Sequence, residues 1–499
     1  MRTKDTVIRT GAFAILSVVA GSAGAAGFQV NTQGIKAMGS SFAGTAATAE
    51  DPTTVAYNPA GMMMLEGTQA SAGLHALLTR TKYNVQARRT LIEGDEGFVP
   101  GSGRGRVDEN SFVPHAYLTH RLSANAAAGL GIYVPFGNAS DFPGDFVGRY
   151  HAQSSDIATV NLNPVFAFRP HEQVSLGFGA IVQFIDADIS NEIDLGHNLA
   201  NSIIEQQNGV SDGERDAIIG ALSHNFDVEN DIRGDNVAFA LNLGVLWEPQ
   251  DGTRLGLSYH SKVQHVIDGR ARRPQTNDDA FRNRLVGTLE NLGVPNPEEV
   301  TQGALGPLGA AGGDIRTVVD LPEVLNLGIA QELNSQWTVM GGATFTRWSR
   351  IDELRFEFPD GSADGGESFA QGLPELRRRD LVQPLRFRDS WRYGVGAMYE
   401  LDESWAFRAG IAYDETPVRN ARARTARLPD NDRILLSAGT TFRFDAFDAR
   451  QSIDLAYMFV RVRSSRIDNE EAAARTRHRL EGDFRTRAHM FGVQYNHQF

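Results

Sequence analysis

Hydrophobic and polar residues alternate with a period of two along most of this chain, and no other feature restricts its fold as strongly. In residues 236–248, for example, large apolar side chains are separated by Ala238, Ala240, Asn242 and Gly244. This period is typical of β-strands with one apolar face and one polar or glycine-rich face. Fourteen segments show it, near residues 68–83, 111–122, 125–135, 157–169, 172–187, 236–248, 253–267, 321–333, 336–349, 388–400, 403–415, 432–444, 451–462 and 485–499.

Short and long connections take turns between these segments. The short ones lie near 123–125, 169–171, 250–252, 334–335, 401–402 and Phe447, and the long ones near 84–110, 136–156, 188–235, 268–320, 350–387, 416–431 and 463–484. A soluble β-sandwich would show the same alternation of apolar and polar residues, but nothing in its fold requires short and long loops to alternate along the chain. The segments are 11–16 residues long, whereas strands of globular proteins have ~5–6 residues. Together with the even strand number and the alternation of short and long loops, this length predicts an all-β transmembrane fold, a 14-stranded antiparallel outer-membrane β-barrel.

Composition excludes several other classes of protein. The 28 phenylalanines argue against a disordered chain, and the absence of cysteine excludes a disulfide scaffold. No apolar run approaches the ~20 residues of a membrane-spanning helix, and the formal charge of −13 argues against nucleic acid as a partner. The 12 histidines lack paired metal-ligand spacing, so we expect no enzyme activity, metal or cofactor.

The first 25 residues have the order of a secretory signal peptide. Arg2, Lys4 and Arg9 precede the mostly apolar stretch 12–20, and small residues at 23–25 form a cleavage site. A buried N-terminal helix is the alternative. We therefore expect residues 1–25 to be removed on export to the bacterial outer membrane.

Residues 26–65 lack the alternation and are small, polar and glycine-containing. They precede the first strand, so they start in the periplasm and can fold back into the barrel. A barrel of 14 strands encloses more space than side chains fill, since ~8 strands already leave little room. We expect residues 26–65 to form a hatch in the lumen and residues 66–499 to form the barrel.

The last strand ends on an aromatic residue. Phe491, Val493, Tyr495 and Phe499 alternate with polar residues or glycine. This ending resembles the assembly signal of bacterial outer-membrane proteins, which implies recognition of Phe499 by the barrel-assembly machinery. The apolar outer face also makes outer-membrane lipid and lipopolysaccharide expected partners.

Several motifs together resemble the FadL/TodX family of outer-membrane transporters. They are the start Ala26-Gly27-Phe28-Gln29, the turn Asn58-Pro59-Ala60, the stretch 405–414 with Pro417-Val418, and the run 428–433 followed by 436–440. The resemblance implies passive transport of long-chain fatty acids or other hydrophobic molecules, from an extracellular groove through an inner pocket to a lateral exit. It also implies that Phe28, Asn58, Pro59 and Ala60 belong to the gate.

In this family the lateral exit lies where a kinked third strand meets the Asn-Pro-Ala turn. The third strand here contains Gly131, Pro135 and Gly137. Pro135 cannot donate a ladder hydrogen bond, so a local break is chemically reasonable. Alternatively, Pro135 simply begins the external loop.

Two long loops contain apolar residues at helical spacing. Residues 197–222 and 278–293 are expected to be helical, and the expected ligand-capture residues are Ile203, Ile204, Ile218, Ile219, Phe281, Leu285 and Leu289. These stripes either pack against each other as a rigid cap or form the family's hydrophobic groove.

The charge pattern departs from that of the fatty-acid members. An acidic run from Asp186 to Asp194 follows the fifth strand, where the family has basic residues, and Arg386 and Arg388 precede the tenth strand. These two arginines are the candidates for a carboxylate clamp, unless they lie at the solvated rim. A neutral hydrocarbon is then also a possible substrate.

Other functions make different predictions for the lumen. A general porin or structural barrel for polar solutes would have an open, charged bore. An outer-membrane hydrolase would need a Ser/His/Asp or acidic constellation, for which isolated residues such as His115 or His260 are weak evidence. We expect a selective transporter, with a plugged lumen lined by apolar residues.

Overall fold

The fold was analysed in a computed structural model that describes residues 27–91, 96–207, 210–310, 313–357, 381–473 and 476–499. The expected signal peptide, residues 1–25, lies outside the described residues.

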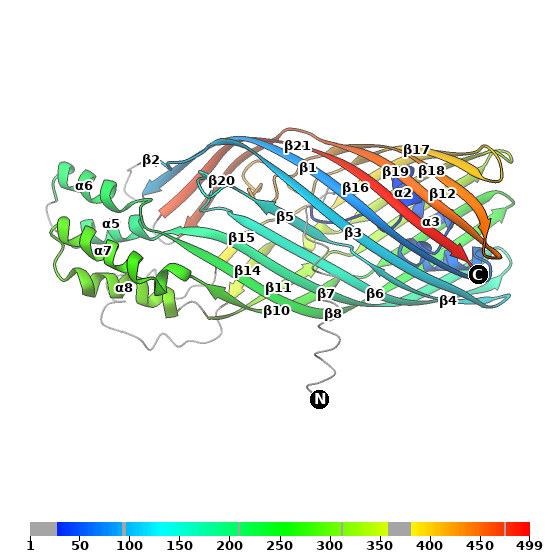
Figure 1. The fold of residues 1–499 in the computed structure, drawn as a ribbon, viewed down its shortest axis with the longest axis horizontal. Coiled ribbons are helices and arrows are strands. Elements are labelled where there is room, and N and C mark those ends of the chain that lie inside the picture. The colour runs from blue at the N-terminus through cyan, green and yellow to red at the C-terminus, as the bar shows by residue number, and fades with distance from the viewer. Residues whose placement is uncertain (1–26, 92–95, 208–209, 311–312, 358–380, 474–475) are drawn as a thin grey trace, which may run out of the picture.

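The chain forms a closed antiparallel β-barrel of fourteen strands (Figure 1). In chain order these are β1 (Thr68–Leu91), β3 (Arg104–Ser123), β4 with β5 (Ala126–Tyr133, Gly137–Asp141), β6 (Ser154–His171), β7 (Val174–Asp194), β8 (Asp227–Gln250), β9 with β10 (Thr253–His260, Val263–Arg272), β11 with β12 (Asp314–Leu321, Val324–Glu332), β13 with β14 (Trp337–Thr346, Glu353–Glu357), β15 with β16 (Leu381–Pro384, Ser390–Glu400), β17 (Trp405–Asp414), β18 (Arg433–Ala446), β19 with β20 (Ala449–Val462, Ser465–Ala473) and β21 (Thr476–Gln498). The short β2 (Glu96–Phe98) pairs with the outer end of β1. Pairing of β21 with β1, from Gln69↔Gln498 to Leu91↔Thr476, closes the barrel.

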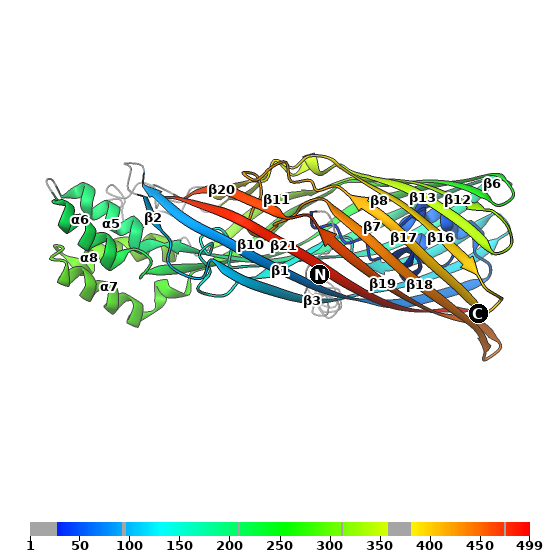
Figure 2. The same ribbon diagram turned by 90° about the horizontal axis from the view of Figure 1, so that it is seen from above.

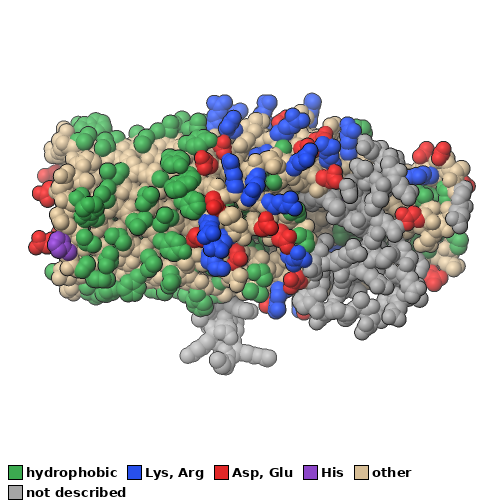
Figure 3. Space-filling view, turned by 180° about the vertical axis from the view of Figure 1, so that it is seen from behind, with side chains coloured by type: hydrophobic (Ala, Val, Ile, Leu, Met, Phe, Trp, Pro, Cys, Tyr) green, Lys and Arg blue, Asp and Glu red, His purple; other side chains and the backbone are tan. Residues whose placement is uncertain are grey.

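The outward positions of the strands are apolar near the end with short turns, where Leu74, Leu455, Phe491 and Val493 are all exposed. On the face seen in Figure 3, hydrophobic side chains likewise cover this end of the barrel as an apolar band, and charged side chains lie beyond them. A closed sheet pairs its backbone groups internally, which allows such an apolar surface to face lipid. The strands also continue past the predicted segments, since β1 has 24 residues where the alternation predicted 68–83.

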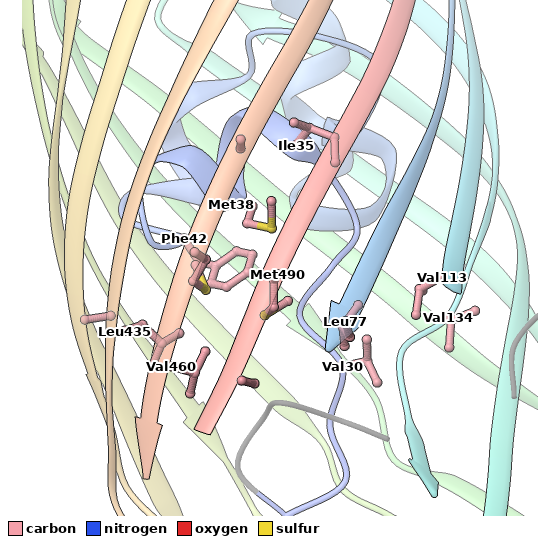
Figure 4. Close-up of a cluster of buried hydrophobic side chains, with 14 of the residues drawn as sticks. Val30, Ile35, Met38, Phe42, Leu77, Val113, Val134, Leu435, Val460 and Met490 are labelled. Atoms are coloured by element: carbon pink, nitrogen blue, oxygen red, sulfur yellow. The ribbon is translucent and has the colours of Figure 1, made fainter. Parts of the chain in front are cut away.

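The N-terminal segment lies inside the barrel near the short-turn end (Figures 1 and 2). It contains α2 (Ile35–Gly39), α3 (Thr45–Thr48), α4 (Thr54–Tyr57) and the 3₁₀ helix η1 (Pro59–Met64). Ile35, Met38 and Phe42 are buried against Leu77 of β1, Leu435 of β18 and Met490 of β21 (Figure 4). We call residues 27–65 the hatch.

The opposite end of the barrel carries the helices of two long loops. These are α5 (Leu195–Gln206), α6 (Asp212–Leu222), α7 (Asp279–Asn291) and α8 (Pro297–Ala310), which we call the extracellular cap, and the 3₁₀ helices η2 (Pro274–Asn277) and η3 (Trp348–Arg350) lie in the loops after β10 and β13. The predicted helices in 197–222 and 278–293 are confirmed. Among the described helices, none has the length and apolar character needed to cross a membrane.

Candidate functional site

Glycines on the inner face of the barrel let the hatch lie directly against the strand backbones. A Cβ atom on Gly256 of β9 would overlap the carbonyl oxygen of Ala46, and one on Gly410 of β17 would overlap that of Ser40. No other residue leaves this space, because every other side chain begins with Cβ. We call this surface the glycine-lined wall: Gly256, Gly328, Gly342, Gly394, Gly410 and Gly439.

An ion pair and a hydrogen bond join the hatch to the inner face of the barrel. The guanidinium of Arg408, on β17, donates to the Glu50 carboxylate and, at 2.6 Å, to the Thr441 hydroxyl. Lys36 Nζ lies 3.4 Å from Asp51 Oδ2, which also accepts a 3.0 Å hydrogen bond from Gln494 of β21. A buried charge is tolerated only when it is paired and hydrogen-bonded, as these are.

Neighbouring charges overcome the cost of burying the hatch carboxylates. Burial alone would raise the pKa of Glu50, but Arg408 and then Lys36 lower it. Burial also acts to raise the pKa of Asp51, which Lys36 and hydrogen bonds from Thr53 and Gln494 lower. Both groups therefore stay ionised at neutral pH.

The Asn58-Pro59-Ala60 turn lies against β7 and β8. Asn58 Nδ2 donates to the carbonyl oxygens of Ala46 (2.6 Å) and Val245 (3.0 Å), and its Oδ1 accepts from the amide of Ala60. A Cβ on Gly244 would overlap that Oδ1 atom. The turn thus ties two parts of the hatch to β8. The 3₁₀ helix that begins at Pro59 also contacts β4, the first part of the third strand, and a gating role of the turn stays a prediction.

The third barrel strand is broken between Tyr133, where β4 ends, and Gly137, where β5 begins. The first residues of the hatch fill this break. Val30 N donates to Pro135 O at 2.7 Å, Gly137 N donates to Phe28 O at 2.8 Å, and Gln29 forms an antiparallel bridge with Phe136. We call this contact of residues 28–30 with residues 135–137 the junction.

Aromatic rings cover the junction. The Phe28 ring centroid lies 4.9 Å from that of Trp348 in an edge-on arrangement and 6.0 Å from that of Phe136. Trp348 is fully buried and lies in η3, which follows β13. Such pairs contribute about 0.5–1.5 kcal/mol beyond area burial, so the junction is held by a few modest contacts.

The break separates two kinds of pairing. The ladder between β3 and β4 runs only as far as Ala116↔Ile132, and β5 pairs with β6 from Gly137↔Ala158 to Asp141↔Ser154. Among the described strands there is no ladder between β3 and β5. Behind the junction, therefore, the barrel wall is not closed by main-chain hydrogen bonds at this place.

Two small cavities flank the junction, each of about 70 Å³. The first is lined by Gly27, Asn138 and Arg427, and the second by Pro135, Phe136 and Arg392. At ~30 Å³ per water molecule this volume holds only a few waters. Neither cavity accommodates a larger ligand in this conformation.

Arg392, on β16, is the notable charge at the second cavity. It is buried, donates to Thr344 Oγ1 at 3.0 Å and lies 5.2 Å from the centroid of the Phe42 ring. None of the ion pairs within 4.0 Å in the described part of the chain includes it. Asp414, which is directly opposite it on β17, lies 3.7 Å from Arg433.

The predicted clamp residues lie elsewhere. Arg386 and Arg388 are exposed at the extracellular rim, where Arg388 Nε donates to Thr416 O at 3.2 Å. The solvated-rim alternative describes their position, because neither side chain reaches the buried lumen.

Sequence comparison identifies the family of this barrel with a hatch. Residues 16–499 match the family described as Outer membrane protein transport protein (OMPP1/FadL/TodX). The chain belongs to this family. It is 26% identical to the "Long-chain fatty acid transport protein" of Escherichia coli (strain K12), covering 100% of both chains. It is also 26% identical to "Outer membrane protein P1" of Haemophilus influenzae, over 97% of each chain.

Solved structures share the fold of this FadL/TodX member. A Pseudomonas aeruginosa FadL homologue superimposes with a TM-score of 0.76 at 24% identity, over 95% of this chain and 100% of that one. The Ralstonia pickettii toluene transporter TbuX gives 0.55 at 16% identity, over 92% and 97%. The protein is therefore a barrel of the bacterial outer membrane.

The predicted capture residues of this FadL/TodX member form the core of the extracellular cap. They come from α5, α6 and α7 and pack on Phe226 and Leu222; they are Ile203, Ile204, Ile218, Ile219, Phe281, Leu285 and Leu289. Six are at most 8% exposed, and Ile204 is partly buried. In this conformation they form a closed core, as the rigid-cap alternative predicted, and a capture role stays a prediction.

Sequence reasoning missed Arg392, Arg408 and Trp348. Arg408 on β17 and Arg392 on β16 each stand among small residues on the inward face of the strand. An arginine among inward glycines is therefore the sequence signal that could have identified them. Trp348 gives no such signal, because it lies in an irregular segment.

Proposed function

We propose that this protein conducts hydrophobic molecules with an anionic head group, long-chain fatty acids being the expected class, passively across the outer membrane. Relatives named as long-chain fatty acid transport proteins support this, although toluene transporters share the fold. A hatch that fills the lumen favours selective transport over a general porin, which needs a continuous aqueous path.

The junction is the proposed gate. The observation that carries this proposal is that residues 28–30 supply the backbone partners of the broken third strand. When they withdraw, the two flanking cavities would join and open sideways between β3 and β5. The substrate would then leave laterally without crossing an aqueous pore.

The gate can be tested by closing the junction with an engineered disulfide. The sequence contains no cysteine that could form a competing disulfide. Gln29 and Phe136 face each other across an antiparallel bridge, a geometry compatible with a disulfide. We expect oxidised Gln29→Cys/Phe136→Cys protein to take up oleate at least tenfold more slowly, and reduction to restore uptake.

A matched control is Ser154→Cys/Ser190→Cys, because these hydroxyls lie 2.6 Å apart on neighbouring strands and do not involve the hatch. That disulfide should leave uptake unchanged. Normal uptake by the locked Gln29/Phe136 variant would reject the junction as the gate.

Arg392 is the proposed partner of the substrate head group. No carboxylate of the described residues lies within 4.0 Å of this buried guanidinium, although Asp414 is opposite it in register, so it can accept an anionic ligand. It also lines the cavity beside the gate. We expect Arg392→Gln to lower oleate uptake at least tenfold while uptake of toluene, a neutral probe, changes less than twofold. Arg386→Gln, at the exposed rim, is the control and should affect neither. Equal losses for both probes would contradict the head-group role.

The terminal Phe499 is proposed to serve barrel assembly. Its side chain is 72% exposed, and its backbone nitrogen donates to Thr68 O at 2.9 Å. An exposed ring at the closing edge is accessible to an assembly factor. Deleting Phe499 should lower the amount of assembled barrel in the outer membrane without changing uptake per barrel.

A further inference from the structure

Basic side chains face one another across four adjacent strands on the outer surface. In one row Arg461 of β19 pairs in register with Arg487 of β21, which pairs with Arg80 of β1. In the next row Arg485 of β21 is opposite Lys82, which is opposite Arg106 of β3. All six are exposed, and we call them the basic patch: Arg80, Lys82, Arg106, Arg461, Arg485 and Arg487.

Like charges directly opposite each other destabilise a sheet, and the patch has little internal compensation. Asp108 lies 2.9 Å from Arg80 and 2.7 Å from Arg106. Among the described residues, no ion pair within 4.0 Å includes Lys82, Arg461, Arg485 or Arg487. Four cations thus stand in register with no carboxylate of the described residues within 4.0 Å.

The corresponding level on β10 and β11 is built differently. There Asp268 is opposite Arg316 and Arg270 is opposite Asp314, with nitrogen–oxygen distances of 2.8 and 3.4 Å. On the face seen in Figure 3, Lys/Arg and Asp/Glu side chains are interleaved beyond the apolar band. The fold therefore can pair its outward charges in register, and on the basic patch it does so only for Arg80, which is opposite Asp108.

The position of the patch points to its ligand. Leu78 precedes Arg80 by two residues, and Phe459 precedes Arg461 by two, so the patch begins where the apolar band ends on the extracellular side. Head groups of the outer leaflet lie at this level. The four strands are spaced ~4.8 Å apart, so the cations extend over about 14 Å across the strands, and the two rows lie ~7 Å apart along them. A patch of this size can contact more than one phosphate group.

We propose that the basic patch binds the phosphorylated glucosamine head group of an outer-leaflet glycolipid. The arginines supply charge-assisted hydrogen bonds to its phosphates, and its acyl chains lie on the apolar band below. Bound phosphate would offset the repulsion between the opposed cations. This inference requires the outer-membrane location alone, so it can fail while the transport proposal holds.

The test compares two triple variants of the full-length protein that lose the same charge. The patch variant is Lys82→Gln/Arg485→Gln/Arg487→Gln, and the control is Arg270→Gln/Arg316→Gln/Arg355→Gln, whose arginines all pair with carboxylates. Both are purified from outer membranes in mild detergent, and native mass spectrometry measures glycolipid bound per barrel. We expect at least a tenfold loss for the patch variant and less than a twofold loss for the control. A heat-modifiability gel verifies that both barrels are folded.

Nanodiscs distinguish the lipid sources. Wild-type protein should bind phosphorylated glycolipid at least tenfold more tightly than the dephosphorylated form and than phosphatidylglycerol. Equal retention by both triple variants would overturn the site. Equal affinity for phosphatidylglycerol would overturn the assignment to the glycolipid.

Discussion

The two sides of the hatch are held in different ways. Toward β9–β18 its backbone lies on the glycine-lined wall, and Arg408 pairs with Glu50. At the junction, residues 28–30 are held by two main-chain hydrogen bonds and the Phe28 ring, with a cavity on each side, whereas Val55 and Met62 farther along the hatch pack with Tyr133 of the third strand. Close packing resists displacement, whereas few contacts and adjacent space permit local opening. Most of the hatch is thus closely packed and residues 28–30 are less so, as the proposed gate requires.

The largest expected effect comes from disrupting the packing of the hatch on the glycine-lined wall. Gly410→Val would place a β-branched side chain onto Ser40 O, a backbone atom that cannot move without displacing the hatch. We expect steady ion conductance in planar bilayers and sensitivity of cells to large antibiotics.

The matched control is Gly341→Val, since a Cβ there meets nothing nearer than 3.5 Å. That variant should remain closed. Closed Gly410→Val channels would show that the wall does not anchor the hatch.

Breaking the ion pair is the next largest effect. Glu50→Gln leaves the buried Arg408 charge without its carboxylate, a change that costs about 3 kcal/mol. Amide hydrogen exchange in α2–α4 should quicken by on the order of 100-fold, given tenfold per ~1.4 kcal/mol. Adding Arg408→Gln removes the unpaired charge, so the double variant should recover part of the protection. No recovery would mean that the two residues act independently.

A smaller effect is expected at the junction. Phe28→Ala removes the ring that contacts Trp348 and Phe136, which costs about 1.5 kcal/mol. Exchange of the Val30 and Gly137 amides should quicken about tenfold, while that of Thr48 and Asn58 stays unchanged. Phe98→Ala, at a ring that is 63% exposed, is the control. Equal loss of protection at all four amides would show that the two sides of the hatch open together and not independently.

The smallest expected effect on the hatch is that of lowering the pH to moderately acidic values. The pKa values of Glu50 and Asp51 are lowered, so their contribution to stability is complete above ~4, the usual carboxyl value, and is lost only as pH falls through the lowered values. Burial acts to lower the pKa of Lys36, but Asp454, Asp51 and Glu50 raise it, so its contribution persists up to its usual pKa near ~10.4.

Hatch protection, corrected for intrinsic exchange rates, should therefore change less than twofold between pH 8 and pH 5. Loss of protection near pH 6 would mean that Glu50 and Asp51 do not anchor the hatch.

Much of the barrel could be predicted from sequence, and the reason is physical. Where a strand crosses lipid, every outward position must be apolar, so the alternation in 236–248 or 485–499 is explicit. The extracellular extensions of β1 and β7 were missed because both of their faces meet water or loops, and no alternation marks them. A break at Pro135 was one of two alternatives that the sequence left open. Its contact with residues 28–30 was not predicted, because no local pattern encodes a bridge between Gln29 and Phe136.

The sequence by itself determined that this chain is a fourteen-stranded barrel with an internal hatch, since the period of two and the sorted loops follow from the contact of each strand with lipid. Only the tertiary structure decided which arginine faces the lumen, which glycines meet the hatch and which cations stand opposite one another. These relations join residues hundreds of positions apart, such as Glu50 with Arg408, and they depend on barrel closure and strand register.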